Sequence, residues 1–261
     1  MAYFNLDDHT IIYYEEYGSR DNPTIIFCNG IVFTTASWNL QKKALSEKFH
    51  LIFYDMRCQG NSSCEKKQFD YTLHVHDLKF LIDYLQLVDP VIAGISYGSF
   101  VAKEFAVQYP DDLKKLILLT PLHSVDFITQ TIYDNWVHFL KHNMLKEFFD
   151  LTILVSYKDV RNYITDEVYQ RELVNFKDKY DADSIMMLMN SIDKETMFKN
   201  YNIIKVPTLL ISAKYDLLHN PTHSDLIAKE IDNSRVITID GGHAVNIECF
   251  KEVNEAIIDF I

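Results

Sequence analysis

Short runs of apolar, β-branched and aromatic residues alternate along the chain with longer segments in which apolar residues recur every three or four positions. Runs of the first kind are typical of strands. The internal runs are apolar at successive positions, as expected of parallel strands that helices cover on both faces. The predicted strands are Thr10–Tyr17, Thr24–Cys28, Leu51–Asp55, Val91–Ile95, Leu116–Thr120, Thr208–Ser212 and Val236–Ile239.

The longer segments predict helices between these strands. One of them is expected to bury a single stripe, because its apolar positions follow helical spacing; they are Leu73, His76, Phe80, Leu81 and Tyr84. The other predicted helices are Tyr97–Tyr109, which Pro110 ends, Pro221–Ile231 and Asn246–Phe260. Strands that alternate with helices predict a doubly wound, mostly parallel α/β sheet with right-handed crossovers.

The alternation stops between Pro121 and Tyr201. Within this stretch, Trp136–Phe149 and Asp183–Met189 have helical character. The stretch is also rich in aromatic residues, namely Phe127, Tyr133, Trp136, Phe139, Phe148, Phe149, Tyr157, Phe176 and Tyr180. We therefore predict a helical cap at 121–201, inserted into a core that comprises 1–120 and 202–261.

Composition and charge narrow the class of protein. The chain has 261 residues, and its 25 Lys and Arg against 37 Asp and Glu give a net charge of −12. The length fits one large domain, or one domain with an insertion, and 48% hydrophobic residues can build a sizeable core. An acidic chain is a poor candidate for binding nucleic acid or an anionic membrane surface.

Two further patterns bear on location. The first residues contain neither a basic leader nor an apolar run, and no stretch approaches the roughly 20 apolar residues that span a bilayer, so we expect no secretory signal and no membrane anchor. The four cysteines show no paired spacing, and we expect free thiols in a cytoplasmic protein; they are Cys28, Cys58, Cys64 and Cys249.

The sequence Gly94-Ile95-Ser96-Tyr97-Gly98 lies where a predicted strand meets a predicted helix. A nucleophile elbow needs this context: a sharp turn exposes the serine, and small neighbours let strand and helix approach each other. The adjacent helix N-terminus favours developing negative charge. Because the bare pattern also occurs by chance, its position between strand and helix is what makes Ser96 a candidate nucleophile.

A serine hydroxyl needs a base and a group that orients the base. Asp216 and His243 each follow a predicted strand, at the sheet edge where α/β proteins assemble their sites. Taken singly, Asp216 could be a solvated loop acid and His243 a packing histidine. Serine, acid and histidine in this order, each after a strand, favour a catalytic triad of Ser96, Asp216 and His243.

Acyl transfer also needs donors for an oxyanion. The turn at Asn29-Gly30 follows a predicted strand and can present the backbone N–H of Ile31. The backbone N–H of Tyr97, directly after Ser96, is the expected second donor. The alternative for Asn29-Gly30 is a tight turn with no catalytic role.

These residues resemble the α/β-hydrolase superfamily, specifically the group with a helical cap after the sixth strand of the core. The resemblance spans nearly the whole chain. It rests on Asn29-Gly30 with Trp38, the loop Asp55–Ser62, Asp77, the elbow Gly94–Gly98, Asp216, and Gly242-His243 with Glu248. It implies an α/β-hydrolase sheet with an inserted cap, and the triad named above.

Three positions depart from the family's pattern. Asn29 stands where a histidine is usual, Cys58 replaces a common glycine, and Ser99 replaces a second glycine after the elbow. None of these changes removes a catalytic group. The haloalkane dehalogenases and epoxide hydrolases of the superfamily use an aspartate nucleophile. Within the resemblance, serine at position 96 is therefore evidence against these two activities.

Other candidate sites are weaker. His74-Val75-His76-Asp77 superficially resembles a metal-binding cluster, but residues two apart on a helix point away from each other, so we predict no metal and no cofactor. His123 is expected near the cap junction, where it could touch substrate or play a structural role. The predicted substrate pocket comprises Asn29, His123, Trp136 and Phe139.

The leading prediction is a serine hydrolase acting on an ester, thioester or lactone with a small, partly apolar acyl group. A second prediction keeps the triad for carbon–carbon bond hydrolysis, acyl transfer or cyclisation in a biosynthetic pathway. A third is a non-catalytic ligand-binding receptor. Fold and triad do not separate the first two, since the pocket sets the chemistry. The expected partner is a small-molecule ester or thioester, with the oligomeric state left open.

Overall fold

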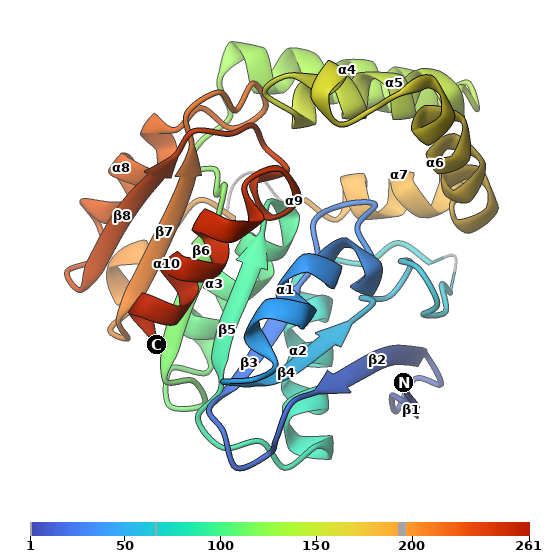
Figure 1. The fold of residues 1–261 in the computed structure, drawn as a ribbon. Coiled ribbons are helices and arrows are strands. Elements are labelled where there is room, and N and C mark those ends of the chain that lie inside the picture. Colours follow the sequence, from blue (N-terminus) through green and yellow to red (C-terminus); the bar gives the residue numbers. More distant parts are fainter. Residues whose placement is uncertain (1, 66, 193–196) are drawn as a thin grey trace.

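A single sheet of eight strands forms the centre of the protein (Figure 1). The computed structural model describes residues 2–65, 67–192 and 197–261. The strands are β1 (Ala2–Asn5), β2 (Ile11–Tyr17), β3 (Thr24–Cys28), β4 (His50–Tyr54), β5 (Val91–Ile95), β6 (Lys115–Leu119), β7 (Thr208–Ala213) and β8 (Ser234–Ile239). Their order across the sheet is β1-β2-β4-β3-β5-β6-β7-β8. The last six strands in this order run parallel, while β1 and β2 form an antiparallel edge.

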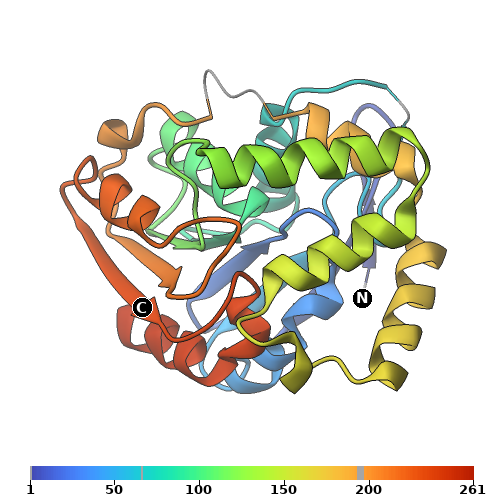
Figure 2. The ribbon, with the colours of Figure 1, turned by 90° about the horizontal axis from the view of Figure 1, so that it is seen from above.

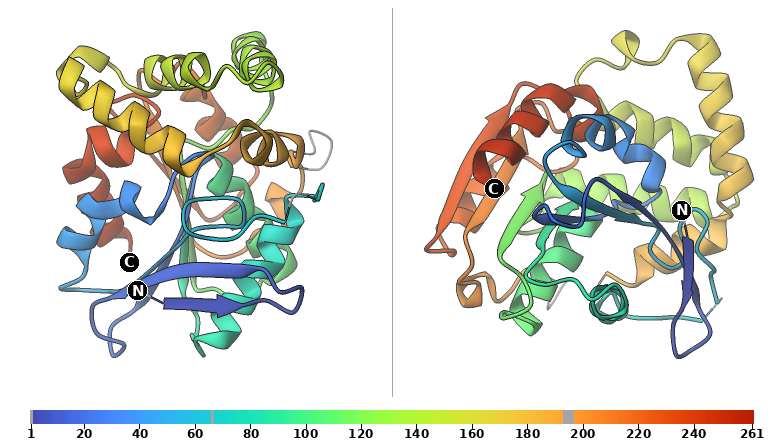
Figure 3. Two further views of the ribbon diagram at one scale, coloured as in Figure 1. Left: turned by 90° about the vertical axis from the view of Figure 1, so that its right-hand side faces the viewer. Right: turned by 60° about the horizontal axis from the view of Figure 1, so that its bottom comes forward.

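The predicted mostly parallel α/β sheet is confirmed. Both ends of each predicted strand lie within two residues of the ends of an observed strand. Only β1 was missed. Its four residues contain one buried side chain, Phe4, so no apolar run marks it in the sequence. The right panel of Figure 3 shows β8 at one edge of the sheet and the blue β1–β2 pair at the other.

Helices cover both faces of the sheet. The helices of the core are α1 (Asn39–Leu45), α2 (Thr72–Tyr84), α3 (Tyr97–Gln108), α8 (Thr222–Ala228), α9 (Val245–Glu248) and α10 (Phe250–Phe260). Helices α2, α3 and α8 pack on one face, and α1 and α10 on the other. Within the described ranges, no helix is long and apolar enough to cross a membrane.

Successive residues of the internal strands serve two hydrophobic cores. In β3, Ile25 and Phe27 face the core beneath α1 and α10, whereas Ile26 and Cys28 face the core beneath α2 and α3. All four side chains are fully buried. This two-sided burial is the reason that the internal strands are apolar at every position.

The predicted buried stripe of α2 was wrong. Its buried residues are His74, Val75, Asp77, Leu78, Leu81 and Ile82, so only Leu81 belongs to the predicted set. Tyr84 is half exposed and stacks with Phe4, their ring centroids 5.2 Å apart. The aromatic residues Phe80 and Tyr84 thus stack on Phe4 of the missed strand β1, Phe80 at the margin of the core and Tyr84 at the surface.

The predicted helix Asn246–Phe260 is two helices. The backbone of Cys249, with φ −120° and ψ 43°, leaves the helical region and separates α9 from α10. This break turns the chain directly after the histidine loop, so Glu248 ends a short helix of its own.

Four helices between β6 and β7 lie over the carboxyl ends of the parallel strands (Figures 1 and 2). They are α4 (Phe127–Lys141), α5 (Leu145–Ser156), α6 (Asp166–Lys179) and α7 (Ala182–Asn190). Most of their aromatic residues form a core of their own, which includes Trp136, Phe148 and Phe176. The cap boundaries 121–201 stay a prediction, and residues 193–196 of that range lie outside the described residues.

The expectation of four free thiols was wrong for one pair. Cys58 and Cys64 form a disulfide, while Cys28 and Cys249 are free and buried. Cys58 has a φ of 64°, and its backbone N–H donates to Ser63 O at 3.1 Å. This tight turn brings the two Cα atoms within 4.2 Å of each other. The six-residue spacing alone does not reveal such a turn.

We expect the disulfide to stabilise the fold. A closed loop of this size restricts the unfolded chain by about 2 kcal/mol. The Cys58→Ser/Cys64→Ser variant should therefore lose about that much free energy of unfolding in urea denaturation. Wild type in reductant should match the variant, and the variant should not respond to reductant. Equal midpoints for oxidised wild type and variant would contradict this prediction.

Candidate active site

Ser96 lies at the turn between β5 and α3, at the carboxyl edge of the sheet. Its φ of 52° and ψ of −118° are unfavourable for a residue with a side chain. Such a conformation stores roughly 1–3 kcal/mol and persists only where the surrounding structure holds it. The backbone N–H of Ser96 donates to Leu119 O at 3.0 Å, which fixes the turn to the neighbouring strand β6.

The two glycines of the motif are required by close packing. A Cβ atom on Gly94 would lie 2.1 Å from Gly98 O, and one on Gly98 would lie 2.2 Å from Cys28 O. Real Cβ atoms do not approach backbone oxygens so closely. The start of α3 therefore packs directly on β5 and β3, and this contact holds Ser96 at the edge.

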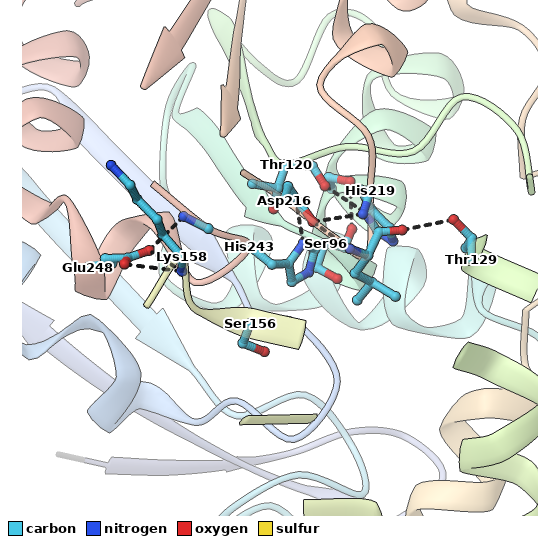
Figure 4. Close-up of polar contacts among 12 residues, drawn as sticks. Ser96, Thr120, Thr129, Ser156, Lys158, Asp216, His219, His243 and Glu248 are labelled. Carbon is cyan, nitrogen blue, oxygen red and sulfur yellow. Dashed lines mark hydrogen bonds and ion pairs between the residues drawn. The ribbon is translucent and has the colours of Figure 1, made fainter. Parts of the chain in front are cut away.

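Asp216 and His243 are hydrogen-bonded partners. His243 Nδ1 lies 2.8 Å from Asp216 Oδ2, and both residues are buried. The other carboxylate oxygen accepts the backbone N–H groups of Leu218 and His219, at 2.9 and 2.7 Å. An ionised carboxylate only accepts, so Nδ1 carries the proton and Nε2 is left able to take one. Figure 4 shows Asp216, His243 and Ser96 grouped together.

Ser96 and His243 line the same cavity. No hydrogen bond joins their side chains among the residues that the structure describes. Such bonds are often long in a site without substrate and tighten in the reactive complex. The arrangement thus brings a serine and a histidine to one cavity wall, and the carboxylate of Asp216 orients the histidine.

The turn after β3 lies beside Ser96. A Cβ atom on Gly30 would lie 3.5 Å from Ser96 Cβ, and Gly30 O accepts Gln59 Nε2 at 2.8 Å. The backbone N–H groups of Ile31 and Tyr97 donate to no protein acceptor within the described part of the chain. Both residues line the cavity that contains Ser96.

Two cavities meet at this site. The one at Ser96 has a volume of about 40 Å³, and a second, more open cavity has about 490 Å³. Aromatic side chains from the cap, namely Tyr133, Trp136 and Phe148, line the smaller cavity. The residues that line both are Val32, Phe33, Thr152 and Ser156.

The sequence of residues 23–249 matches the family described as the alpha/beta hydrolase fold. The chain belongs to this family. Its match covers most of the sequence, including every residue of the arrangement described above. The protein is an α/β-hydrolase-fold enzyme.

Similar proteins cover nearly the whole chain. Mouse monoacylglycerol lipase ABHD6 is 23% identical, over 100% of this chain and 82% of that protein. MGS-M2, an α/β-hydrolase enzyme from a Medee basin deep-sea metagenome library, superposes with a TM-score of 0.90 at 27% identity, over 99% and 96% of the two chains. The enol-lactonase from Burkholderia xenovorans LB400, at a TM-score of 0.86 and 22% identity over 99% of each chain, speaks for the shared fold alone.

In this α/β hydrolase, the residues predicted to form the pocket take different places. Trp136 lines the cavity at Ser96. Asn29 is buried beside it, where its amide binds Tyr54 O and Trp38 Nε1 at 2.9 and 2.8 Å. His123 Nε2 lies 2.8 Å from Glu230 Oε1, away from both cavities.

Phe139 also lies away from Ser96. It lines a groove between α4 and α5, together with Leu151 and Leu154. The orientation of α4 about its axis explains the difference. Trp136, three residues earlier on the same helix, faces the cavity at Ser96. Sequence spacing showed that both residues are helical but not which of them faces the serine.

His219 was missed by the sequence analysis. Its ring lies edge-on to that of His243, with centroids 4.6 Å apart, and its Nδ1 lies 2.7 Å from Thr120 O. Burial lowers the pKa of His219 to about 3, so the ring is neutral. Because a carbonyl only accepts, Nδ1 carries the proton and Nε2 faces the hydroxyl of Tyr133 at 3.4 Å. The one sequence feature that could have pointed to His219 is its position, three residues after Asp216.

The histidines of His74-Val75-His76-Asp77, which superficially resembles a metal-binding cluster, lie on different sides of α2. His74 is buried, edge-on to the ring of Tyr97, and burial lowers its pKa to about 3. His76 is exposed and its Nδ1 lies 3.0 Å from the Tyr109 hydroxyl. Among the described residues, no three His, Cys, Asp or Glu side chains form a group that could hold a metal ion.

Proposed function

We propose that the protein is a serine hydrolase that cleaves a carboxylic ester, thioester or lactone through an acyl-enzyme on Ser96. The observation that carries this proposal is the grouping at one cavity: Ser96 in its strained turn, with His243 held through Nδ1 by Asp216. An activated serine needs a base and an orienting group, and both are within this arrangement.

The proposed reaction has two halves. Ser96 Oγ attacks the carbonyl carbon while His243 Nε2 takes the hydroxyl proton, and the backbone N–H groups of Ile31 and Tyr97 bind the oxyanion. The intermediate collapses, His243 returns the proton to the leaving oxygen or sulfur, and the acyl group stays on Ser96. Water then repeats the sequence and releases the acid. Asp216 keeps His243 in the required tautomer throughout.

The name of one similar protein supports ester chemistry. Mouse ABHD6 is named a monoacylglycerol lipase, and a monoacylglycerol is a carboxylic ester. That name fits the class of substrate proposed for this chain.

The two cavities suggest where the acyl group and the leaving group of a substrate bind. The cavity beside Ser96 is small, about 40 Å³, and aromatic side chains line it, so we assign a short acyl group to it. We assign the leaving group to the larger cavity because it is the more open one. During the second half-reaction the leaving group must depart and water must enter, while the acyl group stays in place.

The first prediction concerns the nucleophile. A fluorophosphonate should label wild type at Ser96, as read by mass spectrometry of the labelled peptide. Ser96→Ala should remain unlabelled and lose hydrolysis of p-nitrophenyl acetate by several orders of magnitude, because the covalent route is gone. Ser124→Ala, which changes an exposed serine, is the matched control and should behave as wild type. Turnover near the wild-type rate in Ser96→Ala would rule out the serine mechanism.

The second prediction concerns the acyl group. Across p-nitrophenyl esters from acetate to octanoate, kcat/KM should fall beyond butyrate, by about tenfold per poorly fitting methylene. Trp136→Ala should enlarge the small cavity and move the preference to longer chains. Phe139→Ala removes an aromatic ring from the same helix but away from Ser96, so it should leave the relative rates unchanged. An unchanged preference in Trp136→Ala, or an equal change in Phe139→Ala, would contradict the assignment.

A further inference from the structure

The backbone on both sides of His243 is held by groups outside its own turn. The N–H of Gly242 donates to Glu248 Oε2 at 2.6 Å. The N–H of Ala244 donates to Ser156 O at 2.8 Å, and Ser156 is the last residue of the cap helix α5. The histidine turn is therefore anchored once to α9 and once to the cap.

The carboxylate of Glu248 joins these two anchors. Besides Gly242, it accepts the backbone N–H of Lys158, which lies 3.2 Å from each of its oxygens (Figure 4). One carboxylate thus bridges the histidine turn and the chain that leaves α5. Hydrogen bonds to a charged acceptor are stronger than bonds between neutral groups.

The cap segment packs directly on the turn. A Cβ atom on Gly242 would lie 2.5 Å from Lys158 N and 2.7 Å from the carbonyl carbon of Tyr157. Only glycine permits this contact of backbone with backbone. A shift of residues 156–158 therefore has to displace the residue beside His243, because no side chain lies between them to absorb it.

The same segment reaches the loop of the catalytic acid. Tyr215, next to Asp216, donates its backbone N–H to Gly241 O at 2.9 Å. Lys158 Nζ lies 4.5 Å from the centre of the Tyr215 ring and pairs with Asp240. The ion pair of Lys158 with Asp240 is exposed and contributes little energy. The connection therefore rests on the backbone N–H groups of Gly242, Ala244 and Lys158, of which the Gly242 bond to Glu248 is part-buried and the Lys158 bond is exposed.

We propose that Glu248 is a positioning residue that ties the histidine turn to residues 156–158 of the cap, so that the cap sets the reach of His243 toward Ser96. This rests on the proposed serine mechanism. Thr152 and Ser156 line both cavities, so a substrate that fills them contacts the helix whose end holds Ala244. Misplacement of a catalytic group by about 1 Å can lower a rate about 100-fold, which makes such a tie consequential.

Variants of Glu248 test this directly. Glu248→Ala should lower kcat for p-nitrophenyl acetate by about 10- to 100-fold, with KM within about twofold, because the substrate cavity keeps its walls. Glu248→Gln retains one acceptor oxygen and should recover part of the loss. Glu252→Gln, at an exposed position on the next helix, is the control and should match wild type.

A second pair of variants tests the contact at the Lys158 N–H. Lys158→Pro replaces the donor hydrogen with a ring carbon, which ends the hydrogen bond to Glu248 and crowds the contact with Gly242, whereas Lys158→Ala keeps the donor. The extended backbone of Tyr157 (φ −114°, ψ 144°) suits a residue before proline. The proline variant should lose more kcat than the alanine variant. Combined with Glu248→Ala, it should add little further loss, because both changes break the same bridge.

The rate at which fluorophosphonate labels Ser96 distinguishes failure of the positioning role from failure of the serine mechanism. We expect labelling of Glu248→Ala to slow in parallel with kcat, while its melting temperature stays well above that of the assay. Labelling and kcat at the wild-type level in Glu248→Ala would overturn the positioning role alone, as would a loss confined to KM or one that follows unfolding. A wild type that is unlabelled at Ser96 would overturn the serine mechanism and this proposal with it.

Discussion

The close approach of α3 to β5 is the constraint on which the site depends. Gly94 and Gly98 allow the two backbones to touch, and the turn between them forces Ser96 into a positive φ. The same contact sets the N-terminus of α3 beside the serine, where its free N–H groups favour a developing negative charge. The strand that leads into Ser96 holds this conformation in place, because β5 is fully buried and is paired with β3 on one side and β6 on the other.

Every other part of the site is arranged around that edge. The turns after β3 and β8 bring Ile31 and His243 to the cavity, and the turn after β7 brings Asp216 to His243, because the carboxyl ends of parallel strands lie at one side of the sheet. The cap enters between β6 and β7 and so lies over this side (Figure 1). It closes the small cavity with aromatic rings and, through the backbone of Ser156, also holds the turn of His243. A hydrogen bond therefore joins the cap to the turn that carries His243.

Much of this could be predicted from the sequence, because local patterns determine it. Two-sided burial makes the internal strands visible, and the spacing of glycines around Ser96 identifies the elbow. Features that depend on distant contacts could not be predicted. The disulfide requires the positive φ of Cys58, the edge-on packing of His219 requires the acid loop to fold over His243, and the outward turn of Phe139 follows from how α4 packs. A strand as short as β1 has too little buried surface to leave a pattern.

If acyl groups pass through Ser96, an acyl-enzyme can be trapped during turnover. Wild type is mixed with p-nitrophenyl acetate, quenched with acid within milliseconds, digested and analysed by mass spectrometry. We expect an acetyl group on the peptide that contains Ser96, formed in the same burst in which about one equivalent of p-nitrophenol is released per enzyme molecule. Turnover with no acetylated peptide and no burst, or acetylation at another residue that turns over at the catalytic rate, would contradict this expectation.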